Sequence, residues 1–203
     1  MQNFRKLALC ITVLLTIMSG LAEARTWFDV VVSQVTPNGK KDYRPGALTG
    51  EEALALYSPA QKRASFAACA EMFPAAQPID PKRIPANLKP MALCSDSFAV
   101  LYSQASKTPL VVVERLSANQ LKNAKDQRRT DQFYADPRIP KEGRAELDDY
   151  RGQDPAVDRG HQAPAADAPT QRAMAQSFAL SNMVPQDPTN NRKAWDVTPC
   201  LYS

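Results

Sequence analysis

The chain has 203 residues, with 25 basic and 21 acidic side chains, one histidine and a net charge of +4 at pH 7. This small positive excess permits a polyanionic partner but does not require one. The sequence contains no HExxH, GxSxG, paired CxxC or phosphate-binding glycine loop. It therefore lacks the motifs that mark zinc proteases, serine hydrolases, thiol redox proteins and nucleotide-binding proteins.

The N-terminus has the pattern of a secretory signal peptide. Two basic residues precede an almost uncharged apolar run, residues 7–22, and an A-x-A cleavage pattern ends at Ala24. The apolar run is shorter than the ~20 residues that a membrane-spanning helix needs. We therefore expect a signal peptide over residues 1–24, a single mature domain over residues 25–203, export to the periplasm or beyond, and no membrane association after cleavage.

The first half of the mature chain indicates helix, then loop, then strands. A helix-forming stretch over Glu51–Ala70 is interrupted at Pro59, and the five prolines of Pro74–Pro90 indicate an extended loop. Two β-rich runs, Phe98–Tyr102 and Leu110–Leu116, are separated by a polar turn and predict an antiparallel hairpin.

The second half is mainly helical in composition. We predict a short helix over Lys141–Tyr150, a helix over Thr170–Leu180 and the start of another helix over Thr189–Trp195. A hairpin combined with such helices is typical of an α+β fold rather than a doubly wound sheet.

Three cysteines remain after the predicted cleavage. Cys69 and Cys94 flank the proline-rich loop, and we prefer them as a disulfide pair. Closing a loop of that size would contribute ~3 kcal/mol to stability if the geometry fits. Cys200 would remain unpaired.

The single histidine lies in the segment VDRGHQAP, residues 157–164. A lone histidine is often a partly buried structural residue, and this alternative stays open. Gly160 permits a close backbone approach, and Pro164 stops a regular helix. We therefore expect His161 on an irregular, solvent-accessible segment, where a mostly neutral imidazole could accept a proton from water.

A second polar segment, SNMVPQ at residues 181–186, precedes NNRKAW at residues 190–195. Asparagines are usually turn or cap residues, and Asn190 could cap the helix that begins here. The amide oxygen of Asn191 is also a hard ligand of the kind that Mg²⁺ accepts while it keeps several waters. Asn191 is therefore a candidate metal ligand.

In combination, VDRGHQAPAAD, SNMVPQ and NxxxW resemble the non-specific DNA/RNA endonucleases of the ββα-metal, or His-Me finger, superfamily. The resemblance covers residues 133–195 and extends more weakly through the preceding hairpin. It implies an antiparallel sheet with a ββα-metal motif. It also implies a Mg²⁺-dependent (or Mn²⁺-dependent) enzyme that hydrolyses phosphodiester bonds of DNA and RNA. Contact through the phosphate backbone does not read sequence.

The resemblance also implies roles for individual residues. His161 matches the general base that deprotonates the attacking water, and Asn191 matches the single protein ligand of a hydrated Mg²⁺. Asn182 matches an asparagine that supports the site by hydrogen bonding. Phosphodiester cleavage needs a nucleophile near neutral pH, which a neutral imidazole can generate by taking a proton from water. It also needs a positive charge next to the developing oxyanions, which a divalent ion supplies.

An arginine that stabilises the charged phosphorane is matched by Arg129, with Arg128 as the alternative. Both could instead be solvated surface residues. Asp158 and Arg159 belong to the motif and are expected to be structural. DNA and RNA are the expected partners, and a homodimer is left open.

The C-terminal end departs from the family pattern. Relatives present a glutamate about two turns after the metal-binding asparagine, and that place falls at Pro199 here. Asp196 lies ~140° round the helix from Asn191 and is not expected to replace it. Since later strands of the family are also absent from the sequence, we expect a C-terminally truncated member.

Three functions follow from these observations. The first is an active metal-dependent endonuclease. The second is an inactive nuclease-fold remnant that binds nucleic acid through the basic stretch Lys122–Arg129 without cleaving it. The third is an exported structural domain held by its disulfide, which explains the cysteines but not DRGH.

Overall fold

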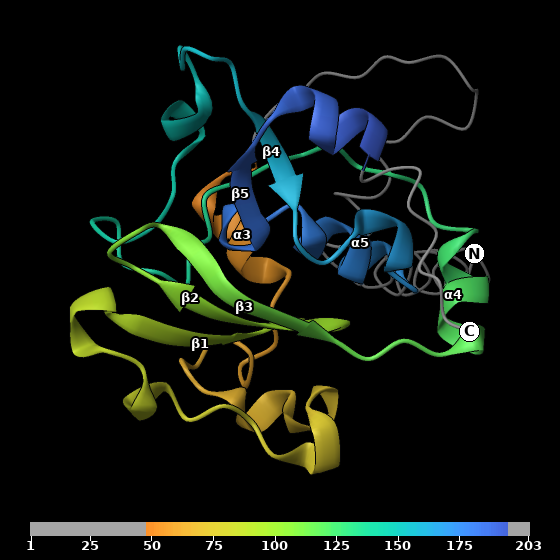
Figure 1. The fold of residues 1–203 in the computed structure, drawn as a ribbon. Coiled ribbons are helices and arrows are strands. Elements are labelled where there is room, and N and C mark those ends of the chain that lie inside the picture. Colours follow the sequence, from red (N-terminus) through yellow and green to blue (C-terminus); the bar gives the residue numbers. More distant parts are fainter. Residues whose placement is uncertain (1–47, 195–203) are drawn as a thin grey trace, which may run out of the picture. The chain divides into compact units, whose positions relative to one another are not determined.

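The computed structural model describes residues 48–194 and shows two antiparallel sheets joined by loops and short helices (Figure 1). The first sheet has the order β1-β2-β3, and the second pairs β4 with β5. The strands are β1 (Pro90–Cys94), β2 (Phe98–Ser103), β3 (Thr108–Glu114), β4 (Asp158–His161) and β5 (Met183–Gln186). This combination of helices and antiparallel strands confirms the predicted α+β class. The predicted signal peptide over residues 1–24, Cys200 and the place of Pro199 lie outside the described residues.

The helices are short. The α-helices are α3 (Gly50–Ala55), α4 (Ala118–Ala124) and α5 (Gln171–Ser177), and η9 (Asn190–Ala194) is a π-helical turn. The remaining turns are 3-10 helices at Phe66–Ala68, Ala70–Met72, Pro74–Ala76, Pro81–Arg83, Ala86–Leu88, Leu147–Tyr150, Ala165–Asp167 and Leu180–Asn182. Each α-helix begins at a serine or threonine whose hydroxyl accepts a hydrogen bond from a backbone N–H of the first turn. Within residues 48–194, no helix combines the length and apolar character needed to cross a membrane.

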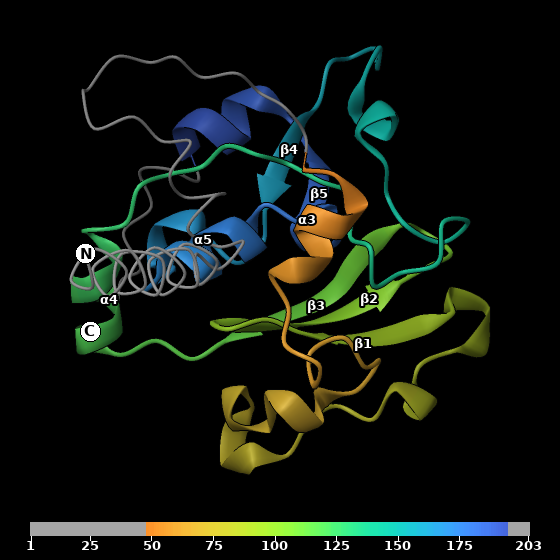
Figure 2. The ribbon, with the colours of Figure 1, turned by 180° about the vertical axis from the view of Figure 1, so that it is seen from behind.

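Strand β2 is the centre of the structure and is buried along its whole length. Alternate residues of a strand point to opposite faces of the sheet, so β2 serves two cores. On one face Ala99 and Leu101 pack against Phe66 and Phe73, which lie in the segment below the sheet in Figures 1 and 2. The other face of β2 is turned toward β4, β5 and α5, which lie on the opposite side of the first sheet (Figures 1 and 2).

The second core connects the sheet to the strand that carries the histidine. It contains Phe98, Val100 and Tyr102 of β2, and they pack with Ile139 and Ala163. Ala163 follows His161 by two residues, so the position of the β4 end depends on this core. Full burial of large apolar side chains contributes roughly 1.5–3 kcal/mol each.

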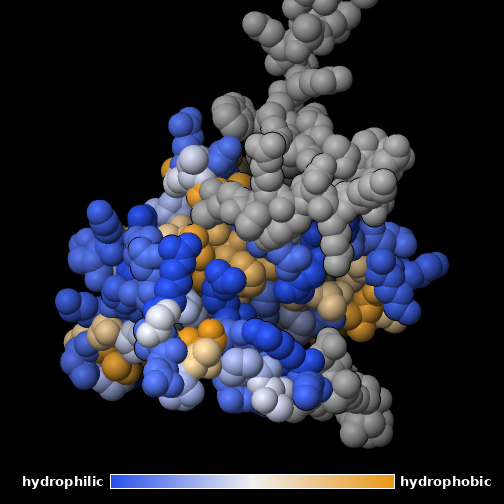
Figure 3. Space-filling view, turned by 90° about the horizontal axis from the view of Figure 1, so that it is seen from above, coloured by the Kyte–Doolittle hydropathy of each residue, from blue (hydrophilic) through white to orange (hydrophobic). Residues whose placement is uncertain are grey.

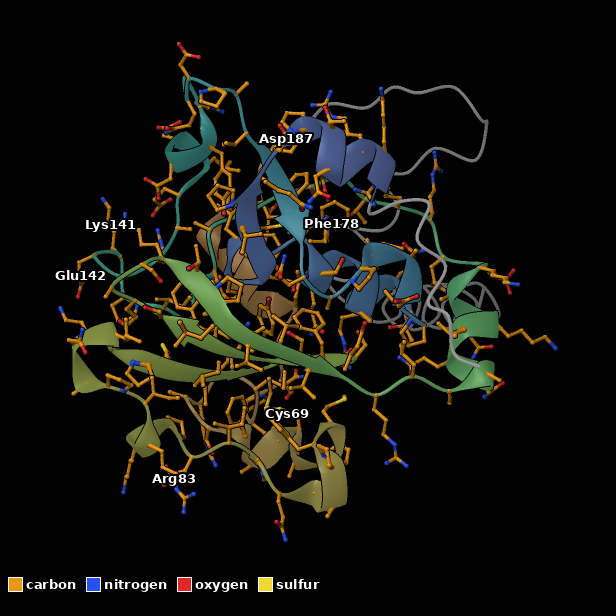
Figure 4. The ribbon with its side chains drawn as sticks, in the orientation of Figure 1. Cys69, Arg83, Lys141, Glu142, Phe178 and Asp187 are labelled. Carbon is orange, nitrogen blue, oxygen red and sulfur yellow. A yellow bond between two sulfur atoms is a disulfide. The ribbon has the colours of Figure 1, made fainter. Side chains whose placement is uncertain are left out.

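A disulfide joins Cys69 to Cys94, with their Cα atoms 5.6 Å apart, and this confirms the predicted pair. The bond ties the 3-10 turns before the proline-rich loop to the end of β1. Figure 4 labels Cys69 just below the first sheet. Both cysteines are fully buried, so the disulfide is part of the core on that face.

Several predicted elements differ from the structure. The hairpin is confirmed as β2–β3, but the sequence did not predict β1, whose first residue, Pro90, is the last residue of the predicted loop. A proline can begin a strand, where its missing N–H does no harm. The predicted helix over Glu51–Ala70 ends at Ala55, and its second half forms only turns and a 3-10 helix. The predicted helix over Lys141–Tyr150 is reduced to one 3-10 turn at its end.

A buried ion pair between Asp136 and Arg138 joins the first sheet to the turn after α5. Arg138 donates two hydrogen bonds to Asp136, at 2.9 and 2.7 Å, and a third to the carbonyl oxygen of Cys94. The hydroxyl of Ser181 donates to the same carboxylate at 2.6 Å. The guanidinium also lies 3.7 Å from the ring centroid of Tyr57. Burial alone would raise the pKa of Asp136, but Arg138 and Ser181 together hold it below its ordinary value.

We expect the substitution Asp136→Ala to lower the free energy of unfolding by about 3–5 kcal/mol, because it leaves the charge of Arg138 buried and unpaired. Urea unfolding followed by circular dichroism at pH 7 measures this loss. The control is Asp148→Ala, which removes an exposed partner of Arg151 and should cost less than about 1 kcal/mol.

The same experiment has a pH dependence with a definite sign. Because the folded-state pKa of Asp136 is depressed, its contribution is complete above its unfolded pKa of about 4 and is lost as the pH falls through the folded value. The difference between wild type and Asp136→Ala should therefore shrink in acid. Equal losses for Asp136→Ala and Asp148→Ala at pH 7 would contradict this account.

Candidate active site

Strands β4 and β5 and the turn η9 bring together the three sequence segments that carry the candidate residues (Figure 1). In the antiparallel register His161 pairs with Met183, and Asp158 pairs with Gln186. At Gly160 a Cβ atom would lie 2.9 Å from the Cβ of Gln186 and would collide with its amide oxygen. Only glycine fits here, which confirms the close approach expected at this position.

His161 ends strand β4 and is only 8% exposed, so the predicted irregular, solvent-accessible segment is wrong. The imidazole packs against two phenylalanine rings that also contact each other, and we call Phe133, His161 and Phe178 the ring cluster. The centroid of His161 lies 5.7 Å from that of Phe133 and 4.9 Å from that of Phe178. Figure 4 labels Phe178 at the end of α5, beside β4. The burial follows because residues from two other segments close over the strand end.

Two arginines flank the ring cluster. The guanidinium carbon of Arg159 lies 4.0 Å from the ring centroid of Phe133, and that of Arg129 lies 4.9 Å from the centroid of Phe178. Arg129 also donates a hydrogen bond to Asp131. Arg129 lies close enough to His161 for its positive charge to lower the pKa of the imidazole, and its role at the site stays a prediction.

The environment of His161 keeps its imidazole neutral. Burial is the main cause that lowers the pKa of His161 to about 3, and the positive charges of Arg129 and Arg159 lower it further. The Nε2 atom of His161 is buried and has no hydrogen-bond partner among the described residues. Buried polar atoms normally have a partner, so an unpaired basic nitrogen next to two cations requires an explanation.

Asn182 is fully buried and holds the chain just after the histidine. Its amide nitrogen donates to the carbonyl oxygens of Ala163 and Ser177, at 2.9 and 3.0 Å, and its amide oxygen accepts from the N–H of Ala163. Its backbone carbonyl also accepts from the N–H of Gln162. The side chain therefore connects the end of β4 to the end of α5.

Asn191 lies on η9 and contacts the other end of β4. Its amide nitrogen donates to Asp158 at 3.0 Å, and the same carboxylate accepts two hydrogen bonds from Arg192. The hydrogen bond from Arg192 is the main cause that holds the pKa of Asp158 below its usual value. At the start of the turn, Asp187 accepts from the N–H groups of Thr189 and Asn190 (Figure 4). This cap fixes the start of η9, the turn that carries the candidate metal ligand Asn191.

The site residues form two groups. His161 and Arg129 lie at the ring cluster, and Asn182 bonds to Ala163 and Ser177, the latter directly before Phe178 in the chain. Asn191 meets Asp158, which lies three residues before His161, roughly 10 Å along the strand. Asp196 and Pro199 lie outside the described residues.

A metal ion at this site would depend on few protein atoms. Among residues 48–194, no group of three or more His, Cys, Asp or Glu side chains could hold a metal. The hydrogen bond from the Asn191 nitrogen to Asp158 orients the amide and leaves its oxygen as a hard ligand. One amide oxygen with a carboxylate next to it fits a largely hydrated Mg²⁺.

The sequence did not identify Arg159 and the two phenylalanines as site residues. Arg159 was expected to be structural, and Phe133 and Phe178 carried no assignment. Phe133 and Phe178 lie far apart in the sequence, and nothing in the sequence shows that their rings contact the same imidazole. The one available signal was the basic residue directly before Gly160 in the DRGH motif.

The chain's single histidine allows a direct test of its protonation state. The Cε1–H signal of His161 can be followed by proton NMR in an untagged protein without assignment. Because the pKa is lowered to about 3, we expect the chemical shift to stay constant between about pH 8 and pH 5. In 6 M urea the same signal should titrate near the ordinary value of about 6.5. A midpoint near 6.5 in the folded protein would show that the imidazole is not desolvated.

Comparisons with known proteins agree with the motif. The family model of the DNA/RNA non-specific endonucleases matches residues 76–198. Human "Nuclease EXOG, mitochondrial" is 38% identical over 106 residues, which cover 52% of this chain and 28% of the relative. Human "Endonuclease G, mitochondrial" is 38% identical over 50% of this chain and 33% of the relative. "Nuclease 1, mitochondrial" of Schizosaccharomyces pombe is 39% identical over 47% and 30%, respectively.

Each match spans a third or less of the relative's length. Among solved structures, the EndoG/EndoGI complex contains a chain that is 28% identical, with a TM-score of 0.45, over 52% of this chain and 43% of that chain.

The relatives' names contradict the expected export to the periplasm or beyond, because they describe mitochondrial nucleases. The prediction depended on residues 1–24 alone, and targeting segments for different compartments share basic and apolar residues. The expected family is confirmed, because its model matches more than half of the chain. This chain belongs to the DNA/RNA non-specific endonuclease family.

Proposed function

We propose that this chain is a Mg²⁺-dependent or Mn²⁺-dependent endonuclease that hydrolyses phosphodiester bonds of DNA and RNA without sequence preference. The observation that carries the proposal is the state of His161: a neutral imidazole whose buried Nε2 has no partner among the described residues, flanked by two arginines. The unprotonated imidazole can accept a proton, and a phosphate bound beside Arg129 and Arg159 would offset the positive charges that lower the pKa of His161, which strengthens it as a base.

In the proposed reaction the Nε2 atom of His161 takes a proton from a water molecule as its oxygen attacks phosphorus. The bond from phosphorus to the 3′ oxygen breaks, the 3′ oxygen leaves with the bonding electron pair and takes a proton from solvent water, and the imidazolium then releases its proton to solvent. Negative charge concentrates on the phosphoryl oxygens in the transition state. Arg129 and Arg159, whose guanidinium groups lie over the rings of Phe178 and Phe133, would stabilise it by binding the phosphate with paired hydrogen bonds.

The remaining residues position these groups. Asn182 uses its side-chain hydrogen bonds to hold the backbone after His161, so we assign it a positioning role rather than a chemical one. Asn191 would hold the metal through its amide oxygen. The bound ion would supply positive charge to the phosphoryl and leaving oxygens.

A second function is supported by the exposed basic residues of α4 and the segment after it. Lys122, Lys125, Arg128 and Arg129 are all exposed, and the face seen in Figure 3 is mainly hydrophilic. A chain that has lost catalysis could still bind the phosphate backbone of nucleic acid through these cations. This alternative predicts salt-sensitive retention of DNA without cleavage.

A plasmid-nicking assay distinguishes the two functions. It uses Mg²⁺ at about 5 mM, because a largely hydrated ion is weakly held. We expect His161→Gln to lower the nicking rate by about 10²–10⁴-fold, the usual contribution of a general base. Chelation of the metal with EDTA should abolish cleavage.

The control is Arg151→Gln, which changes an exposed ion pair outside the ring cluster and should nick at the wild-type rate. Circular dichroism melts of each variant separate loss of the base from loss of the fold. Wild-type cleavage that persists in EDTA, or in a folded His161→Gln variant, would contradict the proposal. Retention of DNA without nicking would favour the binding function.

A further inference from the structure

The carboxylate of Asp158 is shared by two neighbouring residues of η9. Asn191 donates to its Oδ2 atom at 3.0 Å, and Arg192 donates to Oδ2 at 2.7 Å and to Oδ1 at 2.5 Å. Both carboxylate oxygens are therefore engaged by a guanidinium. The candidate metal ligand and a positive side chain thus contact the same acceptor.

The two sides of this ion pair differ in their exposure. The side chain of Asp158 is 15% exposed, whereas that of Arg192 is 68% exposed. The carboxylate is fixed on strand β4, while the arginine reaches over it from the solvent side. An exposed ion pair contributes little to stability, so the guanidinium can leave the carboxylate without loss of the fold.

In this arrangement the Arg192 guanidinium and a divalent metal ion would compete for the negative charge of Asp158. A hydrated divalent ion held by the Asn191 oxygen would lie close to the carboxylate to which Asn191 is hydrogen-bonded. The guanidinium of Arg192 neutralises that carboxylate and repels a second positive charge. Asp158 can attract the metal only to the extent that Arg192 has withdrawn.

We propose that Arg192 is a built-in competitor of the divalent metal: its guanidinium occupies the Asp158 carboxylate in the free chain and weakens metal binding at Asn191. The proposal rests on the proposed function, because it takes Asn191 as the metal ligand. It assigns Arg192 a regulatory role, in which a metal or a phosphate that draws the guanidinium away from Asp158 strengthens the site.

Metal binding can be measured without any catalysis. Titration of the purified chain with Mn²⁺, with the free ion followed by its EPR signal, gives a Kd in the absence of nucleic acid. We expect Arg192→Gln to tighten Mn²⁺ binding by about three- to tenfold at 0.1 M salt, because the variant removes the positive charge that neutralises Asp158, under partial screening by salt.

The matched control is Lys193→Gln. Lys193 is exposed, directly follows Arg192 and carries the same charge, so this variant changes net charge equally. We expect its Kd to change by less than about twofold, since more distant exposed charges are largely screened. In an Asp158→Asn background, Arg192→Gln should tighten binding less than it does with Asp158 present, because no carboxylate charge is left to be released and only the direct repulsion by the guanidinium is removed.

The outcomes separate this inference from the proposed function. Equal Kd values for wild type and Arg192→Gln, with binding lost in Asn191→Ala, would overturn the competition and leave the metal assignment intact. Equal tightening by Lys193→Gln would likewise reduce the effect to net charge and overturn the inference. No Mn²⁺ binding by any variant, in protein shown by circular dichroism to be folded, would overturn both.

Discussion

The buried ion pair between Asp136 and Arg138 is the interaction on which the rest of the structure depends. It joins the carbonyl oxygen of Cys94, at the disulfide end of β1, to the hydroxyl of Ser181. The next residue, Asn182, holds the backbone that follows His161. Two charges with at most 1% exposure each must remain paired, because either one alone would be buried without compensation. The first sheet and the histidine strand are therefore held by one continuous set of hydrogen bonds.

This support explains how the chain can keep an imidazole in an unfavourable position. His161 is enclosed by aromatic rings and lies near two positive charges, and its Nε2 has no hydrogen bond among the described residues. Such an arrangement costs stability unless neighbouring structure enforces it. The same features suit a base, since a neutral imidazole near cations can take a proton while a phosphate is bound between them. On this account, the ion pair helps to offset the free-energy cost of burying the Nε2 atom of His161 without a hydrogen bond.

Sequence reasoning identified the family and the candidate residues because DRGH, SNMVPQ and the following asparagine have a specific order and spacing. It also found the Cys69–Cys94 pair and the β2–β3 hairpin, which depend on local composition. It missed β4 and β5, since each has four residues, includes polar side chains or a proline, and is stabilised by pairing with the other. The burial of His161 could not be predicted, because Phe133 and Phe178 come from separate segments. The partnership of Asp158 with Arg192 likewise depends on how η9 returns to β4.

The central claim is that a desolvated, neutral His161 activates the water that attacks phosphorus. The most direct measurement is the pH dependence of the plasmid-nicking rate at saturating Mg²⁺ and limiting DNA, which reports the groups of the chain without substrate. Because the pKa of His161 is lowered to about 3, the account predicts no acid-side loss of rate with a midpoint near the ordinary histidine value, down to about pH 5. A decline centred near pH 6.5, or no nicking at any pH by the folded chain, would contradict it.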